Sequence, residues 1–170
     1  MTDAEFRDAF QRHKHVVHRF VYRMTGSGSI AEDIVQECFL AFWRKPEAYD
    51  ANRGGQQAYL LGIARKMVLK RWRKEHPQEP LDEMQIVQPP LDATGIGRAQ
   101  AVERAILALP SLQREPVILA EYEEMSLEEI ARATESELAA VKSRLHRARQ
   151  NLRRMLAPLL ESRGVCNGTK

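Results

Sequence analysis

The sequence predicts an all-α protein of two small helical domains joined by a flexible linker, with a helix-turn-helix in the second domain. Apolar residues recur at steps of three and four along most of the 170 residues, and we find no convincing alternating strand. The stretch 77–97 breaks this periodicity with six Pro and Gly residues. These observations predict a first domain at 1–76, a flexible acidic linker at 77–97, a second domain at 98–161 and a disordered tail at 162–170.

Capping sequences indicate where the helices begin. Thr2 to Glu5 has the spacing of a capping box and precedes a run of apolar residues on one helical face. Ser29 to Glu32 has the same spacing and predicts a helix to about Lys45. A third helix is expected over 58–75. Ser126 to Glu129 is another box, which predicts a short helix ending near Ala133.

Charge is distributed unevenly, although the formal net charge is only +3. Residues 59–76 contain six Lys or Arg against one acid, and residues 137–154 again contain six against one. Between these blocks, residues 77–96 carry acids and no Lys or Arg. Two basic blocks separated by acidic segments indicate a polyanion as one partner and a basic surface as another.

Several classes of protein are disfavoured by composition. Cys38 and Cys166 are the only cysteines, so we expect neither a disulfide framework nor a cysteine metal site. His15 and His18 are spaced like metal ligands, but without further ligands we expect no metal there. No phosphate loop or catalytic constellation is present, which predicts a non-enzymatic protein without cofactors. No segment has the length of a membrane span, so we expect a cytoplasmic protein without membrane insertion.

A helix-turn-helix is predicted over 126–149. The short helix after Ser126 is followed by a polar turn at 134–136 and by a longer basic helix. Leu127, Ile130, Val141 and Leu145 would pack the two helices together, leaving the opposite face of the second helix for the major groove of DNA. A solvated basic face on a core helix is the alternative interpretation of the same pattern.

Literal strings in both halves resemble one family. Residues 141–149 read Val-Lys-Ser-Arg-Leu-His-Arg-Ala-Arg, and residues 31–37 read Ala-Glu-Asp-Ile-Val-Gln-Glu. Further matches to the same family follow in the family's order along the chain, at residues 60–65, 108–110, 113–115 and 127–131. These strings resemble regions 2 and 4 of the extracytoplasmic-function (ECF) sigma factors of bacterial RNA polymerase.

The resemblance implies a set of partners and contact residues. The β′ clamp helices of core polymerase would bind one face of the second helix. By their spacing, the residues on this face are Asp33, Gln36, Glu37 and Leu40. The polymerase β flap, promoter DNA and an anti-sigma factor are the other implied partners. The −10 element would contact Gln56, Gln57, Tyr59, Arg65, Lys66 and Lys70. The −35 element would contact Ser136, Lys142, Ser143, Arg144, His146, Arg147 and Arg149.

Two other functions remain open from the sequence. A self-sufficient helix-turn-helix regulator would bind palindromic DNA as a dimer, without polymerase. The acidic helix face and the acidic linker argue against it. A helical nuclease would need clustered carboxylates beside the basic blocks, and the sequence has no such paired acidic motif.

Overall fold

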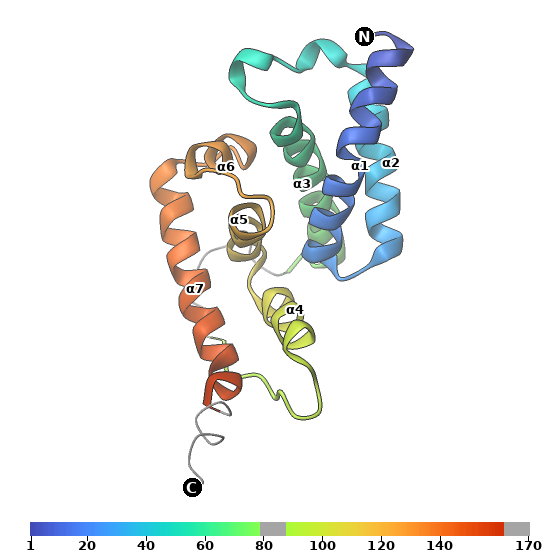
Figure 1. The fold of residues 1–170 in the computed structure, drawn as a ribbon. Helices are drawn as coiled ribbons and strands as arrows, with labels where there is room; N and C mark the ends of the chain where they lie inside the picture. Colours follow the sequence, from blue (N-terminus) through green and yellow to red (C-terminus); the bar gives the residue numbers. More distant parts are fainter. Residues whose placement is uncertain (79–87, 162–170) are drawn as a thin grey trace, which may run out of the picture.

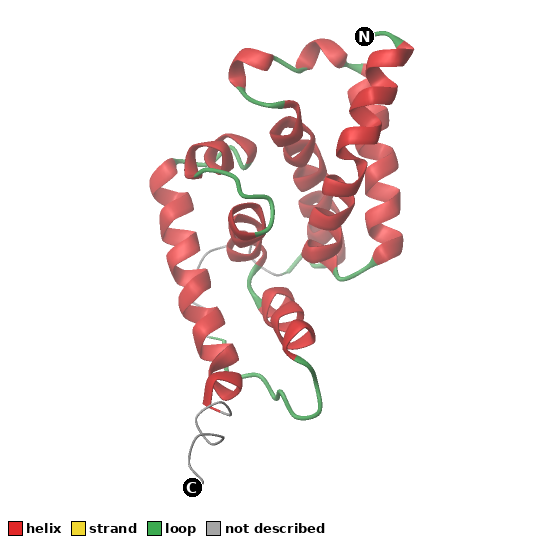
Figure 2. Ribbon diagram, in the orientation of Figure 1, coloured by secondary structure: helices red, strands yellow, loops and turns green. Residues whose placement is uncertain are grey.

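The chain is all-helical in the computed structural model, which describes residues 1–78 and 88–161 (Figure 1). No strand occurs within these ranges (Figure 2), so the predicted fold class is confirmed. Part of the predicted linker (79–87) and the predicted tail (162–170) lie outside the described residues. The elements are α1 (Asp3–Thr25), α2 (Gly28–Arg44), η1 (Pro46–Ala48), η2 (Ala51–Arg53), α3 (Gln56–Glu75), α4 (Arg98–Ala108), α5 (Ser111–Glu121), α6 (Leu127–Ala133) and α7 (Leu138–Glu161).

The first domain is a bundle of α1, α2 and α3. The predicted capping box opens α1, because Thr2 Oγ1 accepts a hydrogen bond from the Glu5 amide and the Glu5 carboxylate accepts one from the Thr2 amide. Gly26 ends α1 in a left-handed conformation (φ 71°), which glycine adopts without a steric cost. The three helices bury one apolar face each, with Val17, Phe20, Val21, Ile34, Phe39, Phe42, Leu60, Leu61 and Ala64 in the core.

The predicted start of α2 is wrong by two residues. Ser27, not Ser29, is the N-cap, and its hydroxyl accepts a hydrogen bond from the Ile30 amide at 3.3 Å. The reason is the backbone conformation, since Ser29 already lies inside α2. Only Ser27, which follows Gly26 directly, has the extended backbone that an N-cap requires.

The second domain consists of α4 to α7. Its core contains Leu109, Ile118, Leu119, Ile130, Val141, Leu145 and Met155, all nearly or fully buried. One buried polar pair joins α5 to α7, where Asn151 Nδ2 donates to Gln113 Oε1 at 2.8 Å. Residues before α4 also lie on α7, since the Leu91 amide donates to the Met155 carbonyl at 3.0 Å.

The two domains are docked against each other (Figure 1). α1 packs against α4 and α5, and α3 packs against α6. The buried apolar residues form one continuous cluster that passes from α1–α3 into α4–α7. Two glycines stand where the domains approach closely. A Cβ on Gly26 would lie 3.1 Å from Leu107 Cδ1, and one on Gly62 would lie 3.3 Å from the Ala133 carbonyl oxygen.

Candidate polymerase and nucleic-acid interfaces

The predicted polymerase-binding residues share one exposed face of α2. Asp33, Gln36, Glu37 and Leu40 are all exposed, and Leu40 retains half of its accessible surface. This face combines two carboxylates, an amide and an apolar side chain, a mixture that suits a basic protein surface with some apolar area. The opposite face of the helix is anchored in the core through Ile34, Cys38 and Phe42.

Aromatic packing holds the end of α2 against α1. The rings of Phe6 and Trp43 have their centres 4.8 Å apart, and those of Phe10 and Phe39 lie 4.9 Å apart, both edge to face. Such pairs are worth about 0.5–1.5 kcal/mol beyond their buried area. The exposed face of α2 is therefore presented by a rigid pair of helices.

The first turn of α3 carries the uncharged residues of the predicted −10 surface. Gln56 and Gln57 are half-buried there. The Tyr59 ring lies 5.4 Å from that of Tyr49 and 6.1 Å from that of Phe42, and burial raises the pKa of its phenol. The Tyr59 ring thus packs against aromatic side chains that hold the η2–α3 loop in place.

The basic residues of this surface are in two different environments. Lys70 is exposed to solvent. Lys66 Nζ donates to Glu135 Oε1 at 2.7 Å, and this contact lowers the pKa of the Glu135 carboxyl. Arg65 forms a bidentate ion pair with Glu115. Both carboxylates belong to the second domain, so the predicted −10 surface is partly covered by it.

Glu115 is a functional candidate that sequence reasoning missed. Its carboxylate is fully buried and accepts hydrogen bonds from Arg65 Nε at 2.7 Å and Arg65 Nη2 at 3.1 Å. Burial raises its pKa, and the Arg65 guanidinium opposes that rise. The signal was present in the sequence, because Glu115 occurs at a core position of the apolar run that continues to Ala120.

Arg114 is a second residue whose role was missed. Its guanidinium donates to the carbonyl of Met24 in the first domain and to those of Leu107 and Leu109 in the second. Burial lowers the pKa of Arg114 to about 10. Arg114 therefore donates hydrogen bonds to carbonyl groups at the end of α1 and at the end of α4, and so links the two domains.

The predicted helix-turn-helix is formed by α6, a turn at 134–137 and α7. The turn closes α6 with two backbone hydrogen bonds, from the Glu135 amide to the Arg132 carbonyl (3.2 Å) and from the Ser136 amide to the Ala131 carbonyl (2.9 Å). Glu135 has a left-handed backbone (φ 49°), the conformation that glycine usually supplies at this position of a helix terminus.

The exposed face of α7 carries part of the predicted −35 surface. Lys142, Ser143 and His146 are exposed at i, i+1 and i+4, while Val141, Leu145 and Ala148 face the core. Arg147 is half-buried, and its Nη2 donates to Ser143 Oγ at 3.1 Å. These four polar side chains lie on one side of the first turns of the helix, where a major groove would be contacted.

The other predicted −35 residues have contacts within the domain. Arg144 Nη1 donates to Ser136 Oγ at 2.8 Å, which ties α7 to the preceding turn. Arg149 pairs with Glu121 of α5 at 2.9 Å. All seven residues thus lie on the turn or on α7. Arg144 and Arg149 also make contacts that stabilise the helix-turn-helix.

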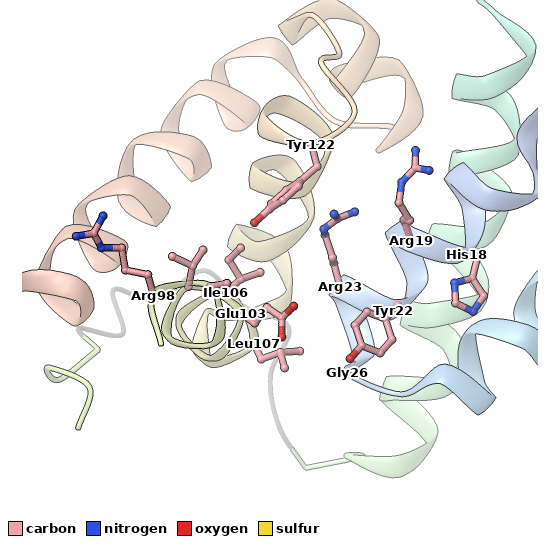
Figure 3. A pocket seen from close by; sticks show the side chains of 12 residues that line it. His18, Arg19, Tyr22, Arg23, Gly26, Arg98, Glu103, Ile106, Leu107 and Tyr122 are labelled. Carbon is pink, nitrogen blue, oxygen red and sulfur yellow. The ribbon is translucent and has the colours of Figure 1, made fainter. Parts of the chain in front are cut away.

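A groove of about 680 Å³ lies along the contact of α1 with α4 and is bordered by Tyr122 at the end of α5 (Figure 3). Arg23 lies with its guanidinium 3.9 Å from the centre of the Tyr122 ring. Glu123, nearly buried, is 3.7 Å from Arg19 and 3.9 Å from Arg23. These contacts add a further charged connection between the domains, apart from those of Arg65 and Lys66.

The described residues offer neither a metal site nor a membrane span. No group of three or more His, Cys, Asp or Glu side chains within 1–78 and 88–161 is arranged to hold a metal ion. Within the same ranges, none of the helices combines the length and apolar character needed to cross a membrane.

Comparisons with known proteins agree across both domains. Family models match residues 9–77 as sigma-70 region 2 and residues 99–152 as sigma-70 region 4. The chain is similar to the ECF RNA polymerase sigma factor SigW of Bacillus subtilis, with 31% identity covering 91% of this chain and 90% of the relative. It is also similar to SigM of Mycobacterium tuberculosis, with 33% identity covering 91% and 78%.

Solved structures share the fold. The sigma factor RpoE of Bartonella quintana, in complex with the anti-sigma factor NepR, superposes with a TM-score of 0.72 at 23% identity, covering 90% of this chain and 97% of that one. CnrH, in complex with the cytosolic domain of CnrY, superposes with a TM-score of 0.66 at 20% identity, covering 95% and 90%.

Proposed function

This chain belongs to the sigma-70 family, in its ECF group, and we propose the surfaces through which it performs the function of that group. It binds core RNA polymerase and directs promoter-specific transcription initiation, and it is not an enzyme. The observation that carries this conclusion is that both region models match in order over nearly the whole chain. A stand-alone dimeric helix-turn-helix regulator is not favoured, because it has no need of a region 2 domain.

Transcription in vitro tests the function directly. Core polymerase with the purified chain, supplied with a library of bacterial DNA fragments, is expected to start at a small set of sites that share a sequence upstream. Core polymerase alone is the control. The same start sites with and without the chain would contradict the function.

We propose that the exposed α2 face binds the β′ clamp helices of the polymerase. The support is its geometry: Asp33, Gln36, Glu37 and Leu40 face solvent together on a helix whose other side is fixed in the core. Charged groups at the rim of an interface steer association, and charge reversal places like charges opposite one another.

The double variant Asp33→Lys/Glu37→Lys is expected to bind core polymerase on the order of tenfold more weakly. Its helix content and melting temperature should remain near those of the wild type, because both side chains are exposed. Glu103→Lys/Glu128→Lys makes the same change in net charge on the second domain and is the control. Equal affinities of the two double variants, measured by fluorescence anisotropy, would remove this role from α2.

Promoter contacts are proposed at two surfaces. For the −10 element these are Gln56, Gln57, Tyr59, Arg65, Lys66 and Lys70, supported by the basic face of α3 and the ordered η2–α3 loop before it. For the −35 element they are Ser136, Lys142, Ser143, Arg144, His146, Arg147 and Arg149, supported by the exposed face of α7. Major-groove reading by the second helix of such a motif is the physical basis of the second set.

We also propose an anti-sigma factor as a partner and the cytoplasm as the place of action. The structural neighbours RpoE and CnrH were solved with NepR and with CnrY, respectively. A protein that copurifies with the tagged chain from its native cells, and blocks its binding to core polymerase when added back, is the expected result. Full activity in the presence of every copurifying protein would count against such regulation.

A further inference from the structure

One groove gathers apolar side chains that the fold leaves exposed (Figure 3). Tyr22 of α1, Leu107 of α4 and Tyr122, which follows α5, all line it and keep 41%, 37% and 38% of their surface accessible. Val102 and Ile106 of α4 are further apolar lining residues. Single exposed apolar side chains are common on soluble proteins, but several in one depression mark a binding site.

The groove has the size of a small-molecule site. Its volume of about 680 Å³ falls within the ~300–1,000 Å³ that such sites occupy, and it lies between helices of two domains, where ligand sites are frequent. The Arg23 guanidinium reaches across it to within 3.9 Å of the centre of the Tyr122 ring (Figure 3). Since a long partner helix would have to break this contact, the shape favours a compact ligand.

The charged lining of the groove is mainly cationic. Arg19, Arg23 and Arg98 line it, and Glu103 is the single acid among the lining residues that the structure describes. Positive charge clustered between apolar walls attracts anions, because walls of low dielectric constant focus the electric field. The lining therefore indicates an anionic ligand.

The two arginines of α1 have hydrogen-bonding capacity that the protein does not use. The Glu123 carboxylate lies 3.7 Å from Arg19 Nη2 and 3.9 Å from Arg23 Nη1, which is longer than a hydrogen bond. Arg23 Nη1 and Glu123 Oε1 are buried without a hydrogen-bond partner. A guanidinium carries five N–H donors, so the accessible parts of both side chains can donate to a carboxylate in the groove.

We propose that this groove binds a small amphipathic carboxylate, that is, an acid group on a short acyl chain. The chain would lie against Tyr22, Val102 and Leu107, and the carboxylate would accept hydrogen bonds from Arg19 and Arg23. Such a ligand would contact both domains at once. The proposal goes beyond the proposed function, since it requires neither polymerase nor DNA.

Calorimetric titration of the full-length chain tests the class of ligand. Octanoate, octanol and octyltrimethylammonium share the apolar chain and differ in charge. Octanoate is expected to bind at one site, roughly tenfold more tightly than octanol, because charged hydrogen bonds are the stronger ones. Acetate, which lacks the chain, should not bind. Equal affinities of the three octyl compounds, or no saturable binding of octanoate, would overturn the proposal.

Substitutions of the arginines test the position of the acid group. Arg23→Gln is expected to weaken octanoate binding about tenfold and to leave octanol binding unchanged. Because Arg23 also lies beside the buried Glu123, the exposed Arg19 provides a second variant that spares the fold, and Arg19→Gln should weaken octanoate binding about two- to fivefold. Arg7→Gln, at an exposed arginine on the same helix, is the control. Equal losses in Arg7→Gln and Arg19→Gln would show that only net charge matters, and would overturn the proposal.

Tyr22→Glu tests the apolar wall, because it places an acid where the acyl chain would lie. It is expected to weaken octanoate binding at least tenfold. Leu160→Glu is the control, since Leu160 is an exposed apolar residue of α7 outside this groove. Loss of binding in Leu160→Glu but not in Tyr22→Glu would place the site on α7 and overturn the proposal. Polymerase binding is measured separately, so failure of either proposal is recognised without the other.

Discussion

Cys38 shows how completely the first domain excludes water. Its side chain has no accessible surface, its thiol donates to the Leu60 carbonyl at 3.4 Å, and burial raises its pKa to about 12. A thiol reacts through its thiolate, which is nearly absent at neutral pH when the pKa is so high. Cys38 therefore fills the space between α2 and α3 and has no redox chemistry in the folded state.

In a Cys166→Ser variant, the remaining thiol is expected to react with Ellman's reagent at pH 8 only after addition of guanidinium chloride. Access requires opening of the bundle, so the rate should follow unfolding. Rapid labelling of the native protein would contradict the packing of α2 against α3. The same variant in denaturant gives the full-reaction control.

α7 is the element on which promoter reading is proposed to depend. Arg147 lies on its N-terminal half beside Ser143, whereas Arg153 is exposed further along. Arg147→Ala is expected to cost about 1–3 kcal/mol at the preferred −35 sequence and to relax discrimination at one position. Holoenzyme binding to a −35 library at two salt concentrations measures both effects.

Arg153→Ala is the matched comparison on the same helix. It should lower affinity evenly across the library and reduce the salt dependence by about one phosphate contact. If Arg147→Ala also loses affinity evenly, the proposed register of the helix in the groove is wrong.

α6 depends on its cap more than the other α-helices do. It has only seven residues, too few to be stable alone, and its capping box is complete: Ser126 Oγ accepts from the Glu129 amide at 3.2 Å and Glu129 Oε2 from the Ser126 amide at 2.8 Å. Ser126→Ala should lower the free energy of unfolding by about 1 kcal/mol. Ser29→Ala, at a serine inside α2, should cost less than half of that in the same urea titration, and equal losses would contradict the cap assignments.

Docking of the two domains is a property of the whole molecule. Breaking a buried ion pair by removing one partner costs about 3–5 kcal/mol when the other charge stays buried. Here the cost is limited, because the domains can separate and let water reach Arg65. Glu115→Gln should therefore weaken docking more than it unfolds either domain.

The continuous core predicts a single cooperative thermal transition for the wild type, and calorimetry of Glu115→Gln is expected to show two separate transitions instead. Glu121→Gln, which breaks the exposed pair with Arg149 inside the second domain, is the control and should shift the transition only slightly. A single, unshifted transition in Glu115→Gln would mean that this ion pair does not hold the domains together.

Much of the fold and of the candidate site follows from local sequence. Apolar steps of three and four identify the helices and their buried faces, and the boxes at Thr2 and Ser126 place two helix starts correctly. The exposed positions of Asp33, Glu37, Lys142 and His146 follow from the same periodicity. Local signals succeed here because helix geometry relates neighbours three and four residues apart, whatever the rest of the chain does.

Only the tertiary structure decided which charges meet. Arg65 and Lys66 occur in a basic block that the sequence assigns to DNA, yet in the isolated chain they contact Glu115 and Glu135 of the other domain. The structure also decided that Ser27, and not Ser29, caps α2. Periodicity shows which side chains point away from the core of their own helix bundle. Whether that surface faces water depends on how the other domain docks on it, because docking is determined by the shapes of the two domains and not by the local sequence of either.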